Sequence, residues 1–325
     1  MIDDRREAPA NVRSLNDRIR NLAKTAGRPE NQLARAIANT VVAQMITVGV
    51  VKGGTAMKLR LGDSASRFTP DFDTSRRGDV PLDVHVEEIT GLLERGWNGF
   101  AGRLAHLPAY APADVPDDYV MRPFSIHLTY RGSNWLKVKL ELGREEVGTG
   151  DHVENRIVAS ELREHFAVLG LEDPAPVLLL AAEPQAVQKL HACTSISPDG
   201  RANERAHDLV DLQLLEQTCE IDLALVARIG RRLFASRGKQ HGRRRSWLRA
   251  CGRSCTHGTL PGSKSCRPSK TRSSGRTDLS GLPARTPAAP RSRRRSAIRC
   301  RRWITRRSCK RSPAAVSLTA AAPST

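Results

Sequence analysis

Two aspartates two residues apart are the strongest candidates for chemistry in this sequence. Asp71 and Asp73 stand in the segment RFTPDFDTSRR, whose alternating pattern predicts a strand. On a strand, such residues project from one face and lie about 7 Å apart. Magnesium binds carboxylate oxygens together with phosphate oxygens of a substrate. The pair therefore predicts a Mg²⁺ site, and a water-exposed acidic strand edge is the simpler alternative.

A glycine pair upstream adds a place for a phosphate. The β-branched run 47–52 predicts a strand, and Gly53 and Gly54 separate it from a helix predicted at about 55–62. Glycines let a phosphate approach the backbone, and a helix N-terminus offers it free N–H groups. Alone, a Gly-Gly pair is usually only a turn. The order of strand, Gly-Gly, helix, Arg67 and paired-Asp strand predicts two-metal nucleotidyl transfer.

The elements that must position these residues follow from periodicity and turn signals. Prolines at 108, 112 and 116 predict a loop over 98–118. An α+β fold with a mixed sheet and a helical C-terminal lobe is expected. Helices are predicted over about 12–26, 30–47, 55–62, 84–95, 176–195, 204–217 and 222–237, and a strand hairpin over 124–142.

Charge divides the chain into two parts. Residues 235–325 carry 24 Lys and Arg but one acidic residue, so residues 1–234 hold 29 basic and 33 acidic residues, a net charge of −4. We expect three parts: N-terminal helices and core over 1–165, a helical lobe over 166–238, and a disordered basic tail over 239–325. The sequence has no apolar run of about 18 residues and no apolar signal region, which predicts a cytoplasmic protein without a membrane span.

The first motif resembles the polymerase-β-like nucleotidyltransferases, and within them the AbiEii/AbiGii type of toxin. The segment VVKGGTA is similar to the family's Leu-Lys-Gly-Gly-Thr-Ala, and Arg67 and the Asp71/Asp73 pair follow in the family's order. The resemblance implies a polymerase-β-like core that covers roughly residues 12–237. It also implies that the two aspartates are catalytic metal ligands, and that the glycine turn and its neighbours bind the nucleotide: Lys52, Gly53, Gly54, Thr55 and Arg67.

Later motifs agree with the resemblance in their order. KVKLELG is similar to the family's third acidic strand, with Glu141 where many relatives carry Asp; its longer side chain changes the geometry of a third metal ligand. Lys137 and Lys139 share its strand face, and a solvated face is the alternative. The resemblance implies that Lys139 binds nucleotide.

The last motif is a helical lysine followed by Arg-x-x-Asp-x-x-Asp. Lys189 stands in EPQAVQKLHA, and Arg205, Asp208 and Asp211 stand in RAHDLVDLQLL. By spacing alone, an intrahelical salt bridge explains them. The resemblance implies instead that Arg205 binds nucleotide phosphates and that Lys189, Asp208 and Asp211 are catalytic.

Taken together, these implications give a metal-dependent enzyme that moves an NMP from an NTP to an acceptor. The family's acceptors include tRNA, and a cognate antitoxin is the expected partner. Because the front of the chain is slightly acidic, RNA contacts are expected from local arginines such as Arg76, Arg77, Arg201 and Arg205.

Two alternatives remain open, and both start from the tail. The first is a non-catalytic nucleic-acid-binding protein driven by the Arg-rich tail. The second is an inactive remnant of a toxin, because periodicity stops near Gly238 and Arg, Ser, Pro, Cys and Ala then dominate, as in the wrong reading frame of a G+C-rich gene. A frameshifted end is the interpretation we favour for residues 239–325.

Overall fold

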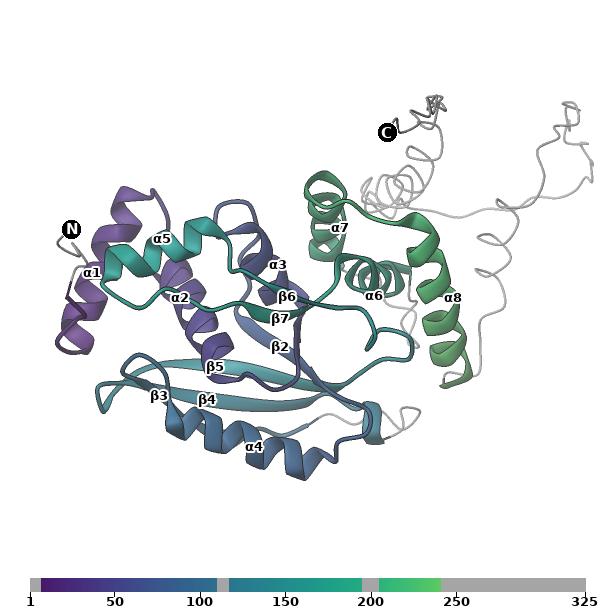
Figure 1. Ribbon diagram of the computed structural model, residues 1–325, viewed down its shortest axis with the longest axis horizontal. Helices are drawn as coiled ribbons and strands as arrows, with labels where there is room; N and C mark the ends of the chain where they lie inside the picture. The colour runs from purple at the N-terminus through teal and green to yellow at the C-terminus, as the bar shows by residue number, and fades with distance from the viewer. Residues whose placement is uncertain (1–6, 110–116, 195–204, 241–325) are drawn as a thin grey trace, which may run out of the picture. The chain divides into compact units, whose positions relative to one another are not determined.

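The structure, a computed structural model, describes residues 7–109, 117–194 and 205–240 (Figure 1). All of them belong to one compact unit, residues 1–253. Residues 241–325 of the predicted tail and residues 195–204, which include Arg201, lie outside the described residues. The helices are α1 (Val12–Thr25), α2 (Glu30–Met45), α3 (Gly53–Leu61), α4 (Leu82–Arg95), α5 (Ser160–Leu169), α6 (Ala182–Thr194), α7 (Ala206–Thr218) and α8 (Leu223–Gln240).

Seven strands form one mixed sheet in the order β3-β4-β5-β2-β1-β7-β6. Two neighbouring pairs, β2 with β5 and β1 with β7, are parallel, and the others are antiparallel. The predicted α+β fold with a mixed sheet is confirmed. The strands are β1 (Val50–Lys52), β2 (Asp71–Arg76), β3 (Phe100–His106), β4 (Arg122–Tyr130), β5 (Ser133–Arg144), β6 (Val153–Arg156) and β7 (Val177–Leu180).

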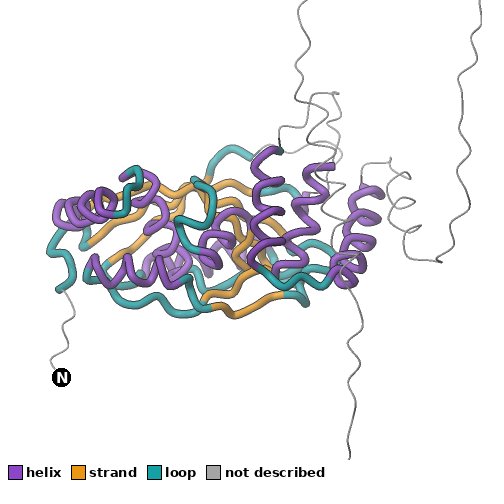
Figure 2. Tube along the Cα trace, turned by 90° about the horizontal axis from the view of Figure 1, so that it is seen from above, coloured by secondary structure: helices purple, strands orange, loops and turns teal. Residues whose placement is uncertain are grey.

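One face of the sheet is covered by helices. Alternate residues of β4 and β5 point to this face and are apolar and buried, as the strand period requires: Phe124, Ile126, Leu128, Val138 and Leu140. They share one core with α1, α2 and α4, and α4 contacts both β3 and α2. The helices and strands are seen from above in Figure 2.

The other face of β3, β4 and β5 is open. The intervening residues of β4 are only half-buried, and Lys137 and Lys139 on β5 are exposed. Asp71 and Asp73 belong to this face, because Phe72 between them is fully buried in the core. The open face therefore carries both candidate carboxylates, each of them partly buried.

Two predicted elements are wrong. Residues 100–106, expected in a loop, form strand β3, because the prolines that suggested a loop begin only at Pro108. Residues 177–180, expected at the start of a helix, form β7, which pairs with β1 at Val51 and Leu179. A short apolar run such as VLLL fits a buried helix or a buried strand equally well.

Helices α6, α7 and α8 gather at one end of this unit, and α6 contacts both of the others (Figure 1). The predicted helices over 204–217 and 222–237 are thereby confirmed. Within the described ranges, no helix is both long and apolar enough to cross a membrane.

Candidate active site

Strand β2 brings the two aspartates beside three other predicted site residues. It pairs with β5, which sets Asp71 opposite Lys139 and Asp73 opposite Glu141. It also pairs with β1, which sets Asp73 opposite Lys52. Residues opposite one another on neighbouring strands share a face and lie close together. The five residues therefore meet on the open face, as the sequence motifs required.

Gly53 makes room for a carboxylate. Its φ of +65° is a conformation that favours glycine, and a Cβ atom there would collide with the carboxylate of Asp73. The sequence suggested that this space serves a phosphate, whereas Asp73 occupies it. At Gly54 a Cβ atom would lie 2.6 Å from the Thr69 hydroxyl oxygen. The glycine pair thus permits close packing of strand β2 against the start of α3.

The carboxylate pair carries negative charge that nearby cations only partly offset. Burial raises the pKa of Asp73 to about 6, with Glu141 and Asp71 raising it further against Lys52 and Lys189. Burial also raises the pKa of Asp71, although Lys139 opposes the shift. Asp73 makes no side-chain hydrogen bond or ion pair with the described residues, so its charge is open to a cation from outside.

Glu141, the third predicted metal ligand, is engaged differently. Its carboxylate accepts a hydrogen bond of 2.5 Å from the Lys139 ammonium, which also lies 3.9 Å from Asp71. Across the described residues, no three His, Cys, Asp or Glu side chains are grouped to hold a metal ion. The donor set that fits a divalent cation is the Asp71/Asp73 pair, because both carboxylates have raised pKa values and only Asp71 has a close cation.

Thr55 on α3 holds the start of strand β2 through a hydrogen bond. Its side chain is fully buried, and its hydroxyl donates a 2.7 Å hydrogen bond to the main-chain carbonyl of Asp71. The Asn39 amide on α2 donates to the same carbonyl at 3.4 Å and to the Thr55 hydroxyl at 3.3 Å. These hydrogen bonds hold the main chain of Asp71 in position at the start of strand β2.

The helical lobe contributes a second charged group. The Lys189 ammonium lies 3.2 Å from Asp208 and 2.5 Å from Asp211, and all three side chains are buried. The Arg67 Nε donates to both oxygens of Asp211, at 3.0 and 3.1 Å. Asp211 therefore holds one cation from each side, and Lys189 acts electrostatically on Asp73 as well.

Arg205 lies at the edge of this group. Its guanidinium is 3.7 Å from Asp208 in an i, i+3 pair, so the intrahelical salt bridge expected from spacing alone is present. The same carboxylate oxygen lies 3.6 Å from the His207 ring. Arg205 is exposed, and its nucleotide-binding role stays a prediction.

Two residues that sequence reasoning missed also join the site. The buried Gln185 amide on α6 donates a 2.8 Å hydrogen bond to the Gly53 carbonyl, and its oxygen accepts one from Arg60 at 3.2 Å. Arg35 on α2 donates to the Lys137 carbonyl and acts electrostatically on Asp71. Arg35 interrupts the apolar run of a buried helix, which is a signal that the sequence does offer.

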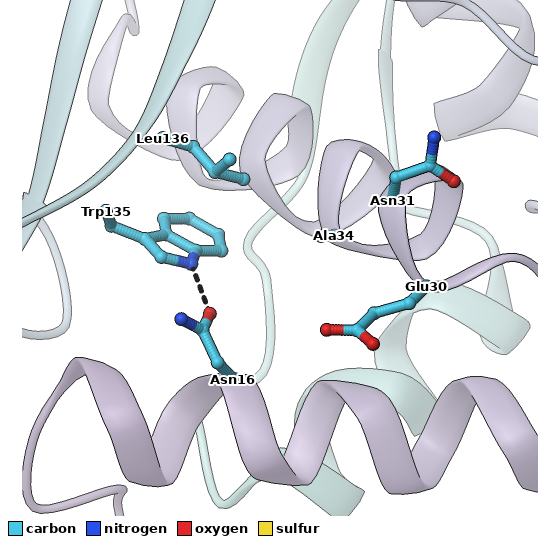
Figure 3. A pocket seen from close by; sticks show the side chains of 6 residues that line it. All are labelled: Asn16, Glu30, Asn31, Ala34, Trp135 and Leu136. Atoms are coloured by element: carbon cyan, nitrogen blue, oxygen red, sulfur yellow. Dashed lines mark hydrogen bonds between the residues drawn. The ribbon is translucent and has the colours of Figure 1, made fainter.

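A separate pocket of about 520 Å³ lies between α1, α2 and the start of β5 (Figure 3). Its Trp135 indole N–H donates to the Asn16 side chain at 2.9 Å, and its Glu30 carboxylate lies 3.3 Å from Arg20. Because Arg20 already pairs with the Glu30 carboxylate, this pocket does not offer a second acidic site like that of Asp71 and Asp73.

A sequence profile identifies the family. The profile described as nucleotidyl transferase AbiEii toxin, type IV toxin–antitoxin system, matches residues 33–295. The chain belongs to this family. The match to the AbiEii family includes every predicted site residue from Lys52 to Asp211 and extends past the last described residue, Gln240. No curated protein matches the chain.

Solved structures similar to this AbiEii chain are distant. One assigned as a nucleotidyltransferase from H. pylori is 18% identical, with 65% of this chain and 83% of that chain covered and a TM-score of 0.36. JHP933 from Helicobacter pylori is 19% identical, covering 66% and 78% with a TM-score of 0.34. The antibiotic-resistance factor ANT(2'')-Ia is 14% identical, covering 70% and 96% with a TM-score of 0.33.

Proposed function

We propose that this chain is an active, Mg²⁺-dependent enzyme that moves an NMP from an NTP to an RNA acceptor, with tRNA as the leading candidate. The observation that carries the proposal is the Asp71/Asp73 pair on an open sheet face, beside the N-terminus of α3. Asp73 has a raised pKa and, among the described residues, no hydrogen-bond or ion-pair partner, as expected of a carboxylate that binds a cation. Family membership supports the reaction type.

Asp71 and Asp73 would hold the Mg²⁺, which supplies stabilisation for the charge that develops on phosphate and pyrophosphate oxygens. Gly53 and Asn39 support the pair: one leaves space for Asp73, and the other fixes the Asp71 main chain. Glu141 lies opposite Asp73 and keeps Lys139 in place beside the pair. We assign Glu141 a supporting role that is smaller than that of the two aspartates.

Lys189 and Arg67 are the cations placed to contact nucleotide phosphates. Both are held by Asp211, which is fully buried and so cannot itself reach a substrate. Orienting two cations through one buried carboxylate reduces the entropy that each side chain loses when phosphate binds. Asp211 and Asp208 therefore act on the reaction through Lys189, Arg67 and Arg205.

We further propose that the protein acts in the cytoplasm as a toxin, where NTP and RNA are both present, and that a cognate antitoxin protein restrains it. Family membership supports this assignment. The alternative of a tail-driven RNA-binding protein predicts no dependence on Asp71 or Asp73.

Transfer of label tests the proposal. The purified full chain is incubated with each α-³²P NTP, Mg²⁺ and total RNA, and label on RNA is measured. We expect label with at least one NTP, none after EDTA, and none with Asp71→Asn. Absence of label with every NTP, in a sample whose fold is verified by circular dichroism, would exclude the proposed activity.

A further inference from the structure

Three basic side chains form a row across the open face of the sheet. Arg103 on β3 pairs in register with His127 on β4, and His127 pairs with Lys137 on β5. Neighbouring strands lie about 4.8 Å apart, so the row spans roughly 10 Å of backbone. We call Arg103, His127 and Lys137 the cation row.

The cation row leads toward the carboxylate pair. Two residues further along β5, about 7 Å away, Lys139 lies opposite Asp71. The other open-face positions between the row and Asp71 are neutral and small: Ala105 and Ser125. A molecule lying across this face would meet two cations, with the His127 ring between them, before it reaches the site, and its first acidic neighbours would be the site residues themselves.

The two charged ends of the row have no partner of their own. Arg103 and Lys137 are exposed, and neither makes an ion pair with any described residue. Some surface arginines are paired, for example Arg77 with Asp79 and Arg163 with Asp173. Partial burial and the charges of Lys137 and Arg103 lower the pKa of His127, which favours its neutral ring. Such a row is unusual in a front region whose net charge is −4.

The arginines that the sequence suggested for RNA are less available. Arg76 is buried and donates to the Val80 carbonyl. Arg77 makes a surface pair with Asp79, and Arg205 lies near Asp208. Arg103 and Lys137 on the open sheet face, by contrast, are exposed and have no ion-pair partner among the described residues.

We propose that the cation row binds the phosphate backbone of a single-stranded segment of the RNA acceptor and guides its end to Asp71 and Asp73. This inference rests on the proposed function, because it takes the acceptor to be RNA. Positive grooves that track a backbone are how proteins bind single strands without reading sequence. A neutral imidazole between two cations adds a ring on which a base can stack.

An acidic protein is the other occupant that such charge would attract. RNA is favoured because the row continues directly into the site where an acceptor must lie, through Lys139 beside Asp71. The small neutral residues Ala105 and Ser125 also leave room on this face for an extended chain of phosphates.

The test uses full-length protein and a double variant, Arg103→Gln/Lys137→Gln. The matched control is Lys24→Gln/Arg95→Gln, which removes the same charge from exposed positions on α1 and α4, the helices that cover the opposite face. Binding of a fluorescent single-stranded RNA is followed by anisotropy over a salt series. All proteins keep the same basic residues after Ala235, so the tail contributes equally.

Loss of two phosphate contacts should lower the slope of log K against log salt by about 1.4 for a single strand. We expect about tenfold weaker RNA binding for the row variant and less than twofold for the control. In the transfer assay, the row variant should raise the KM for RNA and leave the KM for NTP unchanged.

Equal RNA affinity and slope in the row variant and the control would overturn the inference. So would a row variant that binds RNA normally but loses binding to a poly-glutamate peptide, which would assign the row to an acidic protein. The binding assay needs no catalysis, so the two proposals fail separately. RNA binding that depends on the row without any transfer contradicts only the proposed enzyme activity, whereas transfer unaffected by the row contradicts only this inference.

Discussion

Asp73 and Asp211 are both withdrawn from bulk water, yet their surroundings differ. Asp211 is fully buried and has a cation on each side, Lys189 at 2.5 Å and Arg67 at 3.0 Å. Asp73 is partly buried, has a pKa raised to about 6, and has no hydrogen-bond or ion-pair partner among the described residues. The charge of Asp211 is therefore balanced by cations of the described residues, whereas the charge of Asp73 has no such partner.

This difference separates structural from functional charge. A buried charge with good partners contributes to the fold, and removal of one partner leaves the others uncompensated. A carboxylate left without partners costs stability and is kept where a ligand supplies the missing charge. Substitution of each aspartate should therefore affect different properties.

Asp73→Asn should produce the largest loss of activity. It removes charge but keeps shape, so transfer should fall by about 10²–10⁴-fold, as is usual for catalytic groups. Because burial and then the charges of Glu141 and Asp71 disfavour the ionised Asp73 carboxylate, the melting temperature should stay the same or rise. Transfer rate and differential scanning fluorimetry measure the two properties. The control is Asp79→Asn, which removes an exposed carboxylate paired with Arg77. If Asp73→Asn keeps a transfer rate within tenfold of the wild-type rate, Asp73 has no catalytic role.

Asp211→Asn should give the opposite pattern in stability. Loss of its charge leaves Lys189 and Arg67 poorly compensated, which should lower the free energy of unfolding by about 3–5 kcal/mol. Urea denaturation measures the change. Asp173→Asn, at an exposed pair with Arg163, should cost less than about 1 kcal/mol. Unchanged stability for Asp211→Asn would show that the charged group is not structural.

Lys189→Ala should weaken the use of NTP. Removing its ammonium deletes a phosphate contact, so the KM for NTP should rise by about tenfold, which is roughly 1.4 kcal/mol. The KM for RNA should not change. Steady-state kinetics with each substrate varied in turn separates the two, and an unchanged KM for NTP would return Lys189 to a purely structural role.

Glu141→Gln should reduce transfer less than Asp73→Asn. Glu141 holds Lys139 and is not part of a three-residue metal cluster, so its loss should reach about tenfold. The transfer rate of the two variants at one Mg²⁺ concentration gives the comparison. A loss as large as that of Asp73→Asn would place Glu141 among the direct metal ligands.

Gln185→Leu should have the smallest effect in this series. It removes the hydrogen bond to the Gly53 carbonyl and the one accepted from Arg60, each worth about 1 kcal/mol, while keeping a side chain of similar size. We expect a transfer rate about fivefold lower, with no change in the KM for RNA. If the transfer rate does not fall, the hydrogen bond from Gln185 is not needed to position the glycine turn.

Local parts of the site were predictable from the sequence, and distant contacts were not. Gly53, Asp71 and Asp73 lie in one strand–turn–helix–strand segment, so periodicity placed them on one face. The pairing of Arg67 with Asp211 joins residues 144 positions apart, and no spacing rule reports it. The cation row was hidden for a related reason: it depends on the register of three strands, one of which was predicted to be a loop.

The hydrogen bond from Gln185 to Gly53 has a consequence for synthesis of the protein. A ribosome makes the glycine turn and both aspartates of β2 early, whereas Gln185, Lys189 and Asp211 come much later in the chain. A nascent or prematurely terminated chain that ends before α6 therefore holds Asp71, Asp73 and Arg67 but lacks Lys189 and the buried Asp211 that contacts Arg67. All of the residues that we propose for the site are present together only when translation has passed α7.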